Sequence, residues 1–338
     1  MFVLQVALVK GRGGITTAVE EYERMCRAVG VRSACIFQGP ATDALRAQGV
    51  DIIAPPPTIT SPLPLPTGLR GVIAARAQDD RVLAIVHSDR TLAAIRRAAP
   101  GAIIATPCHS DKFNRKGHAD LVITLNADQQ RRVAAGLEHS RARVSLLGNP
   151  YVASAKRIEA DGPARINFAA RFIPTKDPMT LLRAAPLLRE KAQLRFIGAG
   201  ELEAEMHAAV AQSGIAAEFP GWLSDPFADF HRGDVLVLPS HWEGLPYLLQ
   251  EALDRAVPIV AADNPGNRTA LGDGAYGELF PVGDAAALAQ ALDKVLADPA
   301  AARAKAERGR TALHANYGAQ AFWQKLQAEI AAVDAARS

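Results

Sequence analysis

The chain alternates short apolar runs with segments of helical spacing along nearly its whole length. Candidate strands in the first half are FVLQVALV, SACIF, DIIA, VLAIVH, AIIAT, LVITLN and VSLLG. A second series consists of RINFAARF, QLRFIGAG, AAEFPGW, DVLVLPS, PIVAAD and GELFPV. Near-continuous apolar strands separated by helices are typical of parallel sheets that are buried on both faces. Two such series predict two doubly wound α/β domains.

The segments between the strands carry the residues that begin and end helices. Residues 16–30 form an amphipathic pattern that ends at Gly30, which suits a helix C-cap. In residues 177–191, Asp177 can cap a helix and Pro178 can occupy its first position. The last pattern, residues 319–333, predicts an amphipathic helix. Its apolar face is formed by Phe322, Leu326 and Ile330.

A domain boundary is predicted within residues 148–165, where a Gly-Asn-Pro turn opens a polar stretch. The first domain is then residues 1–150, and the second begins at residue 151. Residues 54–68 are rich in proline and predict a rigid extended loop inside the first domain. With 338 residues the chain is longer than one compact core usually organises, which agrees with two domains.

Composition narrows the class of protein. The chain is 49% hydrophobic and 22% charged, which excludes disorder and fibrous repeats. Its three cysteines (Cys26, Cys35 and Cys108) have no C-x-x-C spacing, so a disulfide scaffold or a zinc site is not expected. The apolar N-terminal run covers about nine residues, fewer than the about 20 of a membrane span, and lacks a basic n-region. We interpret it as a buried strand and expect a cytoplasmic protein.

Charge is distributed unevenly along the chain. Residues 1–150 contain 19 Lys or Arg and 12 Asp or Glu, a net +7, whereas the remainder contains 19 and 23, a net −4. The basic half is interpreted either as solvated helix faces or as a surface that meets an anionic lipid or acceptor. Basic residues are not interleaved with aromatic ones, and no helix-turn-helix pattern is found, so nucleic acid is not an expected partner.

Ligands of parallel sheets bind beyond the carboxyl ends of the strands, so the residues there are the candidates for chemistry. After the first strand, KGRGGITT (10–17) allows backbone N–H groups to approach an anion, or is simply a tight turn. Arg171 and Lys176 follow a later strand and can clamp a diphosphate, or are ordinary surface cations. Gly198 and Gly200 are interpreted as close-packing glycines.

The stretch PSHWEGLPYLLQEAL (239–253) carries the most specific signal. Its helix begins near Pro246 and is expected to bury four apolar residues, Leu248, Leu249, Ala252 and Leu253. Glu251 lies among them, and a buried carboxylate needs donors, which a ligand diol such as ribose supplies. Glu243 lies in the preceding loop and can accept from sugar hydroxyls. Each carboxylate taken alone also fits a structural cap or salt bridge.

Glu243 and Glu251 form the E-x7-E pattern of retaining glycosyltransferases of the GT-B fold. The chain resembles glycosyltransferase family 4 with its "glycosyl transferases group 1" domain, strongly over residues 166–297. The matching stretches, in the family's order, are ARFIPTKDPMTLLRA, RFIGAGELEAEM, FPGWLSD, DVLVLPSHWEGLP, EAL, PIVAAD and GDGAYGELFPVGDAAALAQAL. The first half is similar more loosely, through its Gly-rich loop, TPCH, ADLVITLN and LLGNP. The resemblance implies two Rossmann-like domains facing across a cleft, the second ending at 317 and the helix 318–338 crossing back to the first.

The resemblance also implies roles for single residues. Arg171 and Lys176 would bind the donor diphosphate and stabilise the leaving nucleotide. Glu243 would accept from sugar hydroxyls, and Glu251 from the ribose. His109 matches a histidine that approaches the transferred sugar, although alone it is as readily a structural residue. The other donor-binding positions implied are Gly13, Gly14, Gly221, Trp222, Gly244, Leu245 and Pro246.

The implied activity is metal-independent, retaining transfer of a hexose-type sugar from a nucleotide-diphosphate sugar to a glycan or lipid-linked acceptor. Bacterial surface polysaccharide or lipopolysaccharide synthesis is the expected setting, with possible contact at the inner face of an anionic membrane. No cofactor is expected. The sequence lacks an Asp-x-Asp pair, so a bound divalent metal is not expected either. Alternatives are an epimerase or phosphorylase on the same fold, or a non-catalytic nucleotide-sugar-binding protein. Departures from the family pattern are Ala170 and Asp177, where glycines are usual, and the lack of a frequent Glu near Thr269.

Overall fold

The computed structural model divides the chain into two compact units. It describes residues 1–11, 13–57, 59–60, 68–110, 112, 114–154, 156–190 and 192–337. The first unit consists of Met1–Val152 and His314–Ser338, and the second of Ala153–Leu313. Most of the proline-rich stretch expected as a rigid loop, residues 58 and 61–67, lies outside the described residues.

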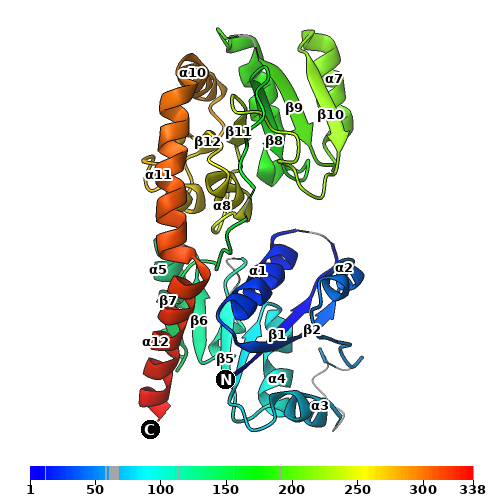
Figure 1. Ribbon diagram of the computed structural model, residues 1–338, viewed down its shortest axis with the longest axis vertical. Coiled ribbons are helices and arrows are strands. Elements are labelled where there is room, and N and C mark those ends of the chain that lie inside the picture. The colour runs from blue at the N-terminus through cyan, green and yellow to red at the C-terminus, as the bar shows by residue number, and fades with distance from the viewer. Residues whose placement is uncertain are drawn as a thin grey trace. The chain divides into compact units, whose positions relative to one another are not determined.

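The first unit is built on a parallel sheet with the strand order β3-β2-β1-β4-β5-β6-β7 (Figure 1). Its strands are β1 (Phe2–Leu8), β2 (Arg32–Gln38), β3 (Ile52–Ile53), β4 (Val82–Val86), β5 (Ile103–Pro107), β6 (Leu121–Thr124) and β7 (Arg143–Leu146). Its helices are α1 (Gly14–Ala28), α2 (Thr42–Ala47), α3 (Gly68–Ala77), α4 (Leu92–Ala98), α5 (Ala127–Gly136) and α12 (Ala319–Arg337), with the short 3-10 turns η1 (Asp89–Thr91) and η2 (Lys116–His118).

The second unit repeats this plan with the strand order β10-β9-β8-β11-β12-β13, again all parallel. Its strands are β8 (Arg165–Ala169), β9 (Gln193–Ile197), β10 (Ala217–Gly221), β11 (Val235–Leu238), β12 (Ile259–Ala262) and β13 (Glu278–Phe280). Its helices are α6 (Pro178–Ala184), α7 (Glu203–Ser213), α8 (Tyr247–Asp254), α9 (Pro265–Ala270), α10 (Ala285–Ala297) and α11 (Pro299–Tyr317), with the turns η3 (Pro174–Lys176) and η4 (Ala185–Leu187). Every strand predicted from an apolar run is present, and the doubly wound fold class is confirmed.

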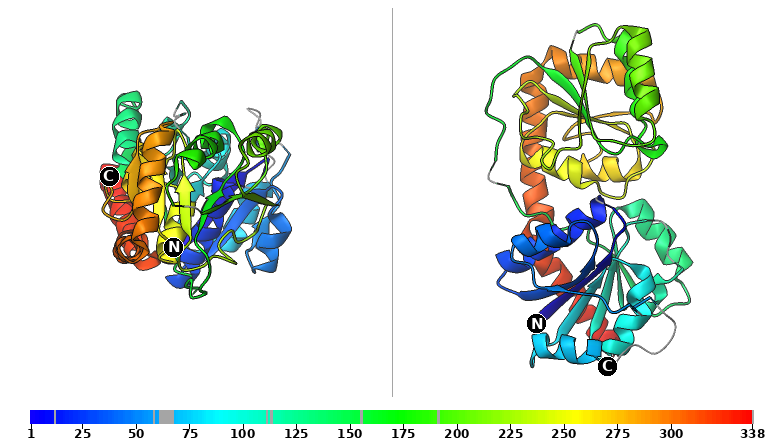
Figure 2. Two further views of the ribbon diagram at one scale, coloured as in Figure 1. Left: turned by 90° about the horizontal axis from the view of Figure 1, so that it is seen from above. Right: turned by 90° about the vertical axis from the view of Figure 1, so that its right-hand side faces the viewer.

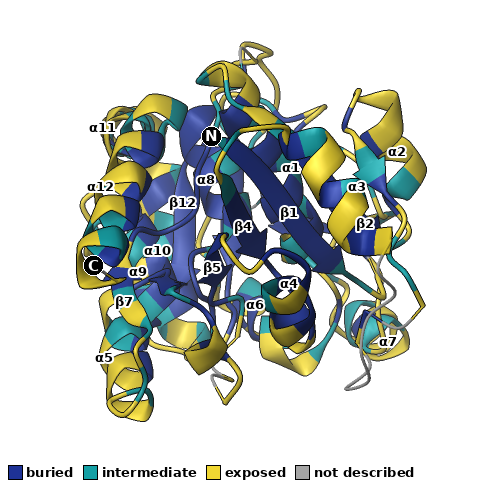
Figure 3. Ribbon diagram, turned by 90° about the horizontal axis from the view of Figure 1, so that it is seen from below, coloured by how far each residue is buried: buried dark blue, intermediate teal, exposed yellow. Residues whose placement is uncertain are grey.

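Helices cover both faces of each sheet, which is why the strands read as continuous apolar runs (Figure 2). In the first unit, α3, α4 and α5 pack on one face, while α1 and α12 pack on the other. The strands β1, β4 and β5 are buried between these layers (Figure 3). In the second unit, one face is covered by α6, α7 and α10. Each unit therefore has its own hydrophobic core.

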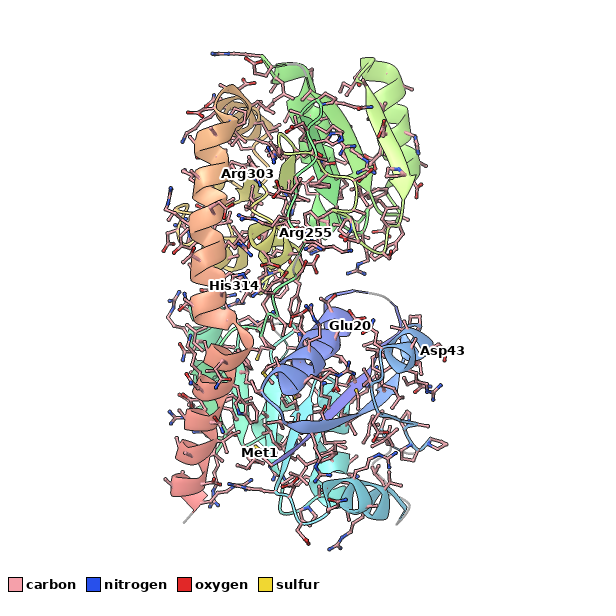
Figure 4. All side chains as sticks on the ribbon, viewed as in Figure 1. Met1, Glu20, Asp43, Arg255, Arg303 and His314 are labelled. Atoms are coloured by element: carbon pink, nitrogen blue, oxygen red, sulfur yellow. The ribbon has the colours of Figure 1, made fainter. Side chains whose placement is uncertain are left out.

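The last helix belongs to the first unit. The predicted apolar face of α12 is buried at all three of its positions, and it packs against α1 and the sheet. Ion pairs add to this anchoring at three points along α12: Arg81 with Asp334, Arg143 with Glu329, and Arg337 with Asp120. The preceding helix, α11, begins in the second unit, so its labelled residues Arg303 and His314 fall in different units (Figure 4).

One predicted helix is shorter than its pattern. The helical pattern over residues 177–191 yields α6, which ends at Ala184, and then the single 3-10 turn η4. Pro186 explains the early end, because it has no N–H to donate and its ring clashes with the preceding turn. The start is as predicted: Asp177 accepts from the Thr180 N–H and Pro178 opens the helix. Among the described residues, no helix combines the length and apolar character that crossing a membrane requires.

Candidate functional site

Both sheets reverse their strand order at one point, and several of the candidate residues follow the strands that flank these two points. In the second unit the order reverses between β8 and β11, and in the first between β1 and β4. Chain connections leave a crevice at the carboxyl ends of such neighbouring strands, where ligands of doubly wound sheets bind. The loops after β8 and β11, and after β1 and β4, therefore define the candidate site in each unit.

The switch point of the second unit joins two residues from different loops. Lys176 follows β8 and Glu243 follows β11, and the Lys176 Nζ lies 2.5 Å from the Glu243 Oε1. The side chain of Glu243 is 9% exposed and that of Lys176 is 22% exposed, so the pair is largely desolvated. An ionised pair at this distance forms a strong, charge-assisted hydrogen bond. The exposed side chain of Arg171 stands in the same loop as Lys176, immediately beyond the Ala170 that follows β8.

A second contact ties the same two loops together. The His241 Nε2 lies 3.0 Å from the Asp177 Oδ2, and the His241 N–H donates to the Thr175 carbonyl. Asp177 is in the left-handed conformation with φ 45° and also caps α6. In the sequence, Asp177 was a departure from the family pattern, and His241 was not singled out. The structure shows that each is the partner of the other, and that together they hold the backbone that carries Lys176.

The backbone at Gly198 and Gly200 packs directly against the loop that carries Arg171. A Cβ at Gly198, where φ is 148°, would lie 1.9 Å from the Ala170 carbonyl oxygen. One at Gly200 would lie 2.4 Å from the Phe172 carbonyl oxygen. The gap is closed by backbone hydrogen bonds, among them Phe172 N to Ala199 O at 3.0 Å. The sequence interpretation of close-packing glycines is therefore correct, with the loop after β8 as the neighbour they admit.

The start of α9 supports the Glu243 loop, a contact that the sequence did not predict. A Cβ at Gly266 would lie 2.4 Å from the Glu243 carbonyl oxygen. Asn264 caps α9 through the Asn267 N–H and donates its own amide to the Ser240 carbonyl at 2.9 Å. The N-P-G-N order after a strand predicts this helix start, because Asn before Pro is typical of a helix cap.

The burial expected along α8 needs correction. Leu249, Ala252 and Leu253 are buried as predicted, but Leu248 is only half-buried; Glu251 is half-buried, as a carboxylate that accepts from a ligand would be. The polar residues that α8 does bury are Gln250 and Asp254. The Asp254 carboxylate accepts from the Ser154 N–H at 2.7 Å. The apolar periodicity predicted the wrong burial here because α8 is short. Over about two turns it does not distinguish the positions that face the core from those that face solvent.

The remaining donor-binding candidates of the second unit lie at two places around this sheet edge. Gly244 and Leu245 are buried after Glu243, and Pro246 stands directly before α8. At the end of β10, the Gly221 carbonyl accepts from the Gly198 N–H at 2.9 Å, and φ of Gly221 is 75°. Trp222 follows with 47% of its surface exposed, a high value for so large an apolar residue.

In the first unit the glycine-rich loop leads directly into α1. Gly13 is the N-cap residue and Gly14 the first residue of α1, and no side chain caps the helix. A Cβ at either glycine would meet no atom within 4 Å, so space is open beside this backbone. The positive end of α1 therefore begins beside open space that can admit an anion.

His109 follows β5 and is half-buried. Its Nε2 lies 2.9 Å from the Nδ1 of His87, and the two rings are stacked with centroids 5.2 Å apart. Burial, together with the nearby Lys116 ammonium, lowers the pKa of His109 to about 3. Lys116 is itself buried and paired with Asp89 at 2.8 Å. The sequence singled out His109 and missed His87, although VLAIVH ends on it. Among the described residues, no three His, Cys, Asp or Glu side chains gather as metal ligands.

Comparison with known proteins shows what the second unit is similar to. Residues 153–312 match the family model described as "Glycosyl transferases group 1". The lipopolysaccharide core biosynthesis glycosyltransferase LpsE of Rhizobium meliloti (strain 1021) is 26% identical over 214 residues, 62% of this chain and 60% of LpsE. The putative glycosyltransferase EpsD of Bacillus subtilis (strain 168) is 33% identical over 153 residues, 44% of this chain and 39% of EpsD. The chain thus spans about half the length of these curated relatives.

The likeness of fold extends over the whole chain. The crystal structure of Anabaena Alr3699/HepE in complex with UDP and glucose superposes with a TM-score of 0.80 at 14% identity, covering 98% of this chain and 100% of that one. The family match and the structural likeness agree with the two parallel Rossmann-like sheets described above. Residues 153–312 are thus similar to the Glycosyl transferases group 1 family, in a chain whose two Rossmann-like domains are consistent with the GT-B architecture.

Proposed function

We propose that this chain is a glycosyltransferase that moves a hexose-type sugar from a nucleotide-diphosphate sugar to a glycan or lipid-linked acceptor. The observation that carries the proposal is the pairing of Lys176 with Glu243 at the switch point of the second sheet, beside Arg171. Cations at the carboxyl ends of parallel strands suit a diphosphate, and a carboxylate beside them suits sugar hydroxyls. The family match of this unit supports the same activity.

The proposed chemistry follows from the charges. Departure of a nucleoside diphosphate leaves negative charge on its terminal phosphate, and Arg171 and Lys176 would stabilise it as it develops. Glu243 and the backbone of Gly244 would hold the sugar, while Glu251 would accept from the ribose. Gly221 and Trp222 would contact the base, and Leu245 and Pro246 would shape the sugar pocket. With two fixed cations at the diphosphate, we propose a reaction that needs no divalent metal. The E-x7-E spacing of Glu243 and Glu251, which resembles that of retaining glycosyltransferases, supports retention of the anomeric configuration.

In the first unit, we propose that Gly13 and Gly14 offer backbone N–H groups to the donor phosphate. His109 is proposed to contact the transferred sugar. The excess of positive charge in residues 1–150 supports an anionic acceptor or contact with the inner face of an anionic membrane. The name of LpsE, a lipopolysaccharide core biosynthesis enzyme, supports a surface-polysaccharide or lipopolysaccharide acceptor. The HepE complexes with UDP, with UDP and glucose, and with UDP-glucose support a nucleotide-diphosphate donor.

A donor screen tests the proposal. The chain is mixed with UDP-, GDP- and ADP-sugars, and binding is followed as a rise in the midpoint of thermal unfolding, because a ligand of the folded state stabilises it. Release of the nucleoside diphosphate is then measured with and without glycan or lipid-linked acceptors, in the presence of a metal chelator. We expect one donor to bind and turn over in chelator. Binding without turnover on any acceptor would favour a nucleotide-sugar-binding protein, and turnover only with added metal would contradict metal independence.

A further inference from the structure

Three polar residues form a continuous chain in the interior of the first unit, and this chain ends at His109. Gln5 lies in β1, Glu23 in α1, and His87 directly after β4; all three are less than 5% exposed. The His87 Nε2 lies 3.2 Å from the Gln5 Oε1, and the His87 Nδ1 lies 2.9 Å from the His109 Nε2. These contacts connect a fully buried amide to the half-buried imidazole at the carboxyl end of β5.

The far end of this chain fixes the orientation of the Gln5 amide. The Gln5 Nε2 faces two oxygens, the Val19 carbonyl at 3.2 Å and the Glu23 carboxylate at 3.4 Å. A carbonyl oxygen can only accept, so the Gln5 group that faces it must be the NH2 and not the oxygen. Glu23 is in turn held as an acceptor by the Ser33 hydroxyl at 2.9 Å. The Gln5 Oε1 is thereby turned toward His87.

The orientation of the Gln5 amide determines the tautomer of His87, and the tautomer of His87 then determines that of His109. The Gln5 oxygen accepts, so the His87 Nε2 must carry a proton and donate it. Burial and the adjacent His109 lower the pKa of His87 well below its ordinary value, so the ring stays neutral and its Nδ1 is an acceptor. The His109 Nε2 must then carry a proton and donate to that Nδ1. On His109, the atom left with a lone pair is Nδ1.

We infer that Gln5, Glu23 and His87 are positioning residues that fix His109 in the Nε2–H tautomer, so that its Nδ1 accepts a hydrogen bond from a ligand hydroxyl. None of the described residues hydrogen-bonds to the His109 Nδ1. An amide turned the other way would reverse every donor in the chain and make the same atom a donor. The residue that selects between these two states is Gln5, which touches no candidate ligand position itself.

Neighbouring groups hold the pair of rings in place. Tyr22 of α1 packs edge-on against His87 with ring centroids 5.4 Å apart. On the other side, the Lys116–Asp89 pair places a cation near His109, which disfavours a second positive charge there. The Asp89 carboxylate also accepts from the Thr106 hydroxyl at 3.3 Å. The His109 Nδ1 carries a lone pair, so it can accept from a sugar hydroxyl. An ionised carboxylate or phosphate of the glycosyl acceptor has no proton to donate to it.

The role of His109 toward a sugar rests on the proposed function, but the tautomers can be measured without turnover. Long-range proton–nitrogen NMR correlations on protein labelled with 15N-histidine distinguish the Nε2–H from the Nδ1–H tautomer. At neutral pH we expect neutral Nε2–H rings at both His87 and His109, with the signals assigned by single substitution of each histidine. An Nδ1–H tautomer at His109 overturns the inference, whatever the enzyme does.

Variants then connect the tautomer to turnover. Gln5→Leu removes the acceptor for the His87 Nε2–H, so we expect mixed tautomers at both rings. The fall in kcat/KM should be roughly 10- to 100-fold, by analogy with the outer partners that orient metal-ligating histidines. Glu23→Gln keeps the Gln5 orientation, because the Val19 carbonyl and the new amide oxygen still accept, and should keep the Nε2–H tautomers. Thr124→Val is the matched control: it removes another buried hydrogen bond of this unit, to the Ser145 carbonyl, outside the chain of contacts.

The outcomes separate the two proposals. Mixed tautomers in Gln5→Leu with unchanged kcat/KM overturn the positioning role, and so does an equal loss of activity in Thr124→Val. Should Gln5→Leu fail to fold, the tautomers of the wild-type chain still decide the inference. Expected tautomers in a chain that turns over no sugar nucleotide support the hydrogen-bonded arrangement and reject the transferase.

Discussion

The two switch points of this chain are built on one topology and carry opposite chemistry. In the second unit the loops beyond the sheet are joined by the Lys176–Glu243 ion pair and by the contact between His241 and Asp177. In the first unit the groups proposed to meet the ligand are uncharged, and the Lys116–Asp89 ion pair lies beside them. A glycine-rich turn leads into α1, and the two uncharged imidazoles of His87 and His109 are linked through Gln5 to the interior.

The difference follows from what each side is proposed to meet. A leaving nucleoside diphosphate gains negative charge and needs fixed cations, which must be held by carboxylates while no ligand is present. A sugar hydroxyl stays uncharged and needs a hydrogen-bond acceptor in a fixed position. A neutral imidazole held in one tautomer provides that acceptor. Under this proposal, two units of the same architecture would bind an anionic leaving group and an uncharged sugar hydroxyl, because different residues follow their equivalent strands.

The largest effect is expected from removing the cation of the second unit. Lys176→Ala should lower kcat/KM by about 100- to 1000-fold, the loss typical of one group that stabilises charge in the transition state. Release of nucleoside diphosphate from the preferred donor measures it. Lys294→Ala is the control, because Lys294 is an exposed lysine of the same unit that is also paired with a glutamate. A comparable loss in both variants, or full activity of Lys176→Ala, would remove the ionic half of the comparison.

The glycines beneath the Arg171 loop should matter next. Gly200→Ala places a methyl group 2.4 Å from the Phe172 carbonyl oxygen, so backbone must move. We expect the free energy of unfolding to fall by roughly 1–3 kcal/mol and donor affinity to weaken. In the first unit, Gly71→Ala within α3 meets no atom within 4 Å and should raise stability by about 0.5–1 kcal/mol. Urea unfolding measures both, and a stable Gly200→Ala variant with normal donor binding would contradict the supporting role of this glycine.

The smallest effect concerns acid and the last helix of the first unit. Burial alone would raise the pKa of Glu329, but hydrogen bonds from Arg143 and Ser145 outweigh it and lower that pKa. A carboxyl with a lowered pKa stabilises the fold above its ordinary pKa of about 4, and loses that contribution as the pH falls below it. Wild-type stability should therefore decrease in that range, by less than about 1 kcal/mol from this pair.

Glu329→Gln removes this titration, so its urea midpoint should depend less on pH below about 4 than that of the wild type. The exposed Glu205 of α7, in the second unit, provides the control Glu205→Gln, which should follow the wild-type curve. Equal acid dependence in all three proteins would show that this anchoring of α12 contributes no stability.

Much of the fold could be predicted because it depends on local patterns. Strands buried on both faces appear as apolar runs, and the caps at Gly30, Asp177 and Pro178 mark the helix ends beside them. The pattern was less informative within α8, where it expected Leu248 in the core and missed Gln250. It overestimated the length of α6, where a single proline outweighed the apolar periodicity.

Part of the candidate site could also be predicted. Glu243, Lys176 and Arg171 were singled out by type and by position after strands. Their mutual contact was not, since residues 67 positions apart in the chain meet only when β8 and β11 become neighbours. The supporting contacts of Gly266 and Asn264 were missed for the same reason.

The sequence by itself determined the two sheets, the order of their strands along the chain and the types of residue that stand at their carboxyl ends. It determined these because periodicity, capping and turn chemistry act over a few residues. Only the tertiary structure decided that Asp177 faces His241, that Gln5 is turned by the Val19 carbonyl, and that His109 is held by His87. Those are hydrogen bonds between separate strands and helices, and their direction is set by which buried groups can donate and which can only accept.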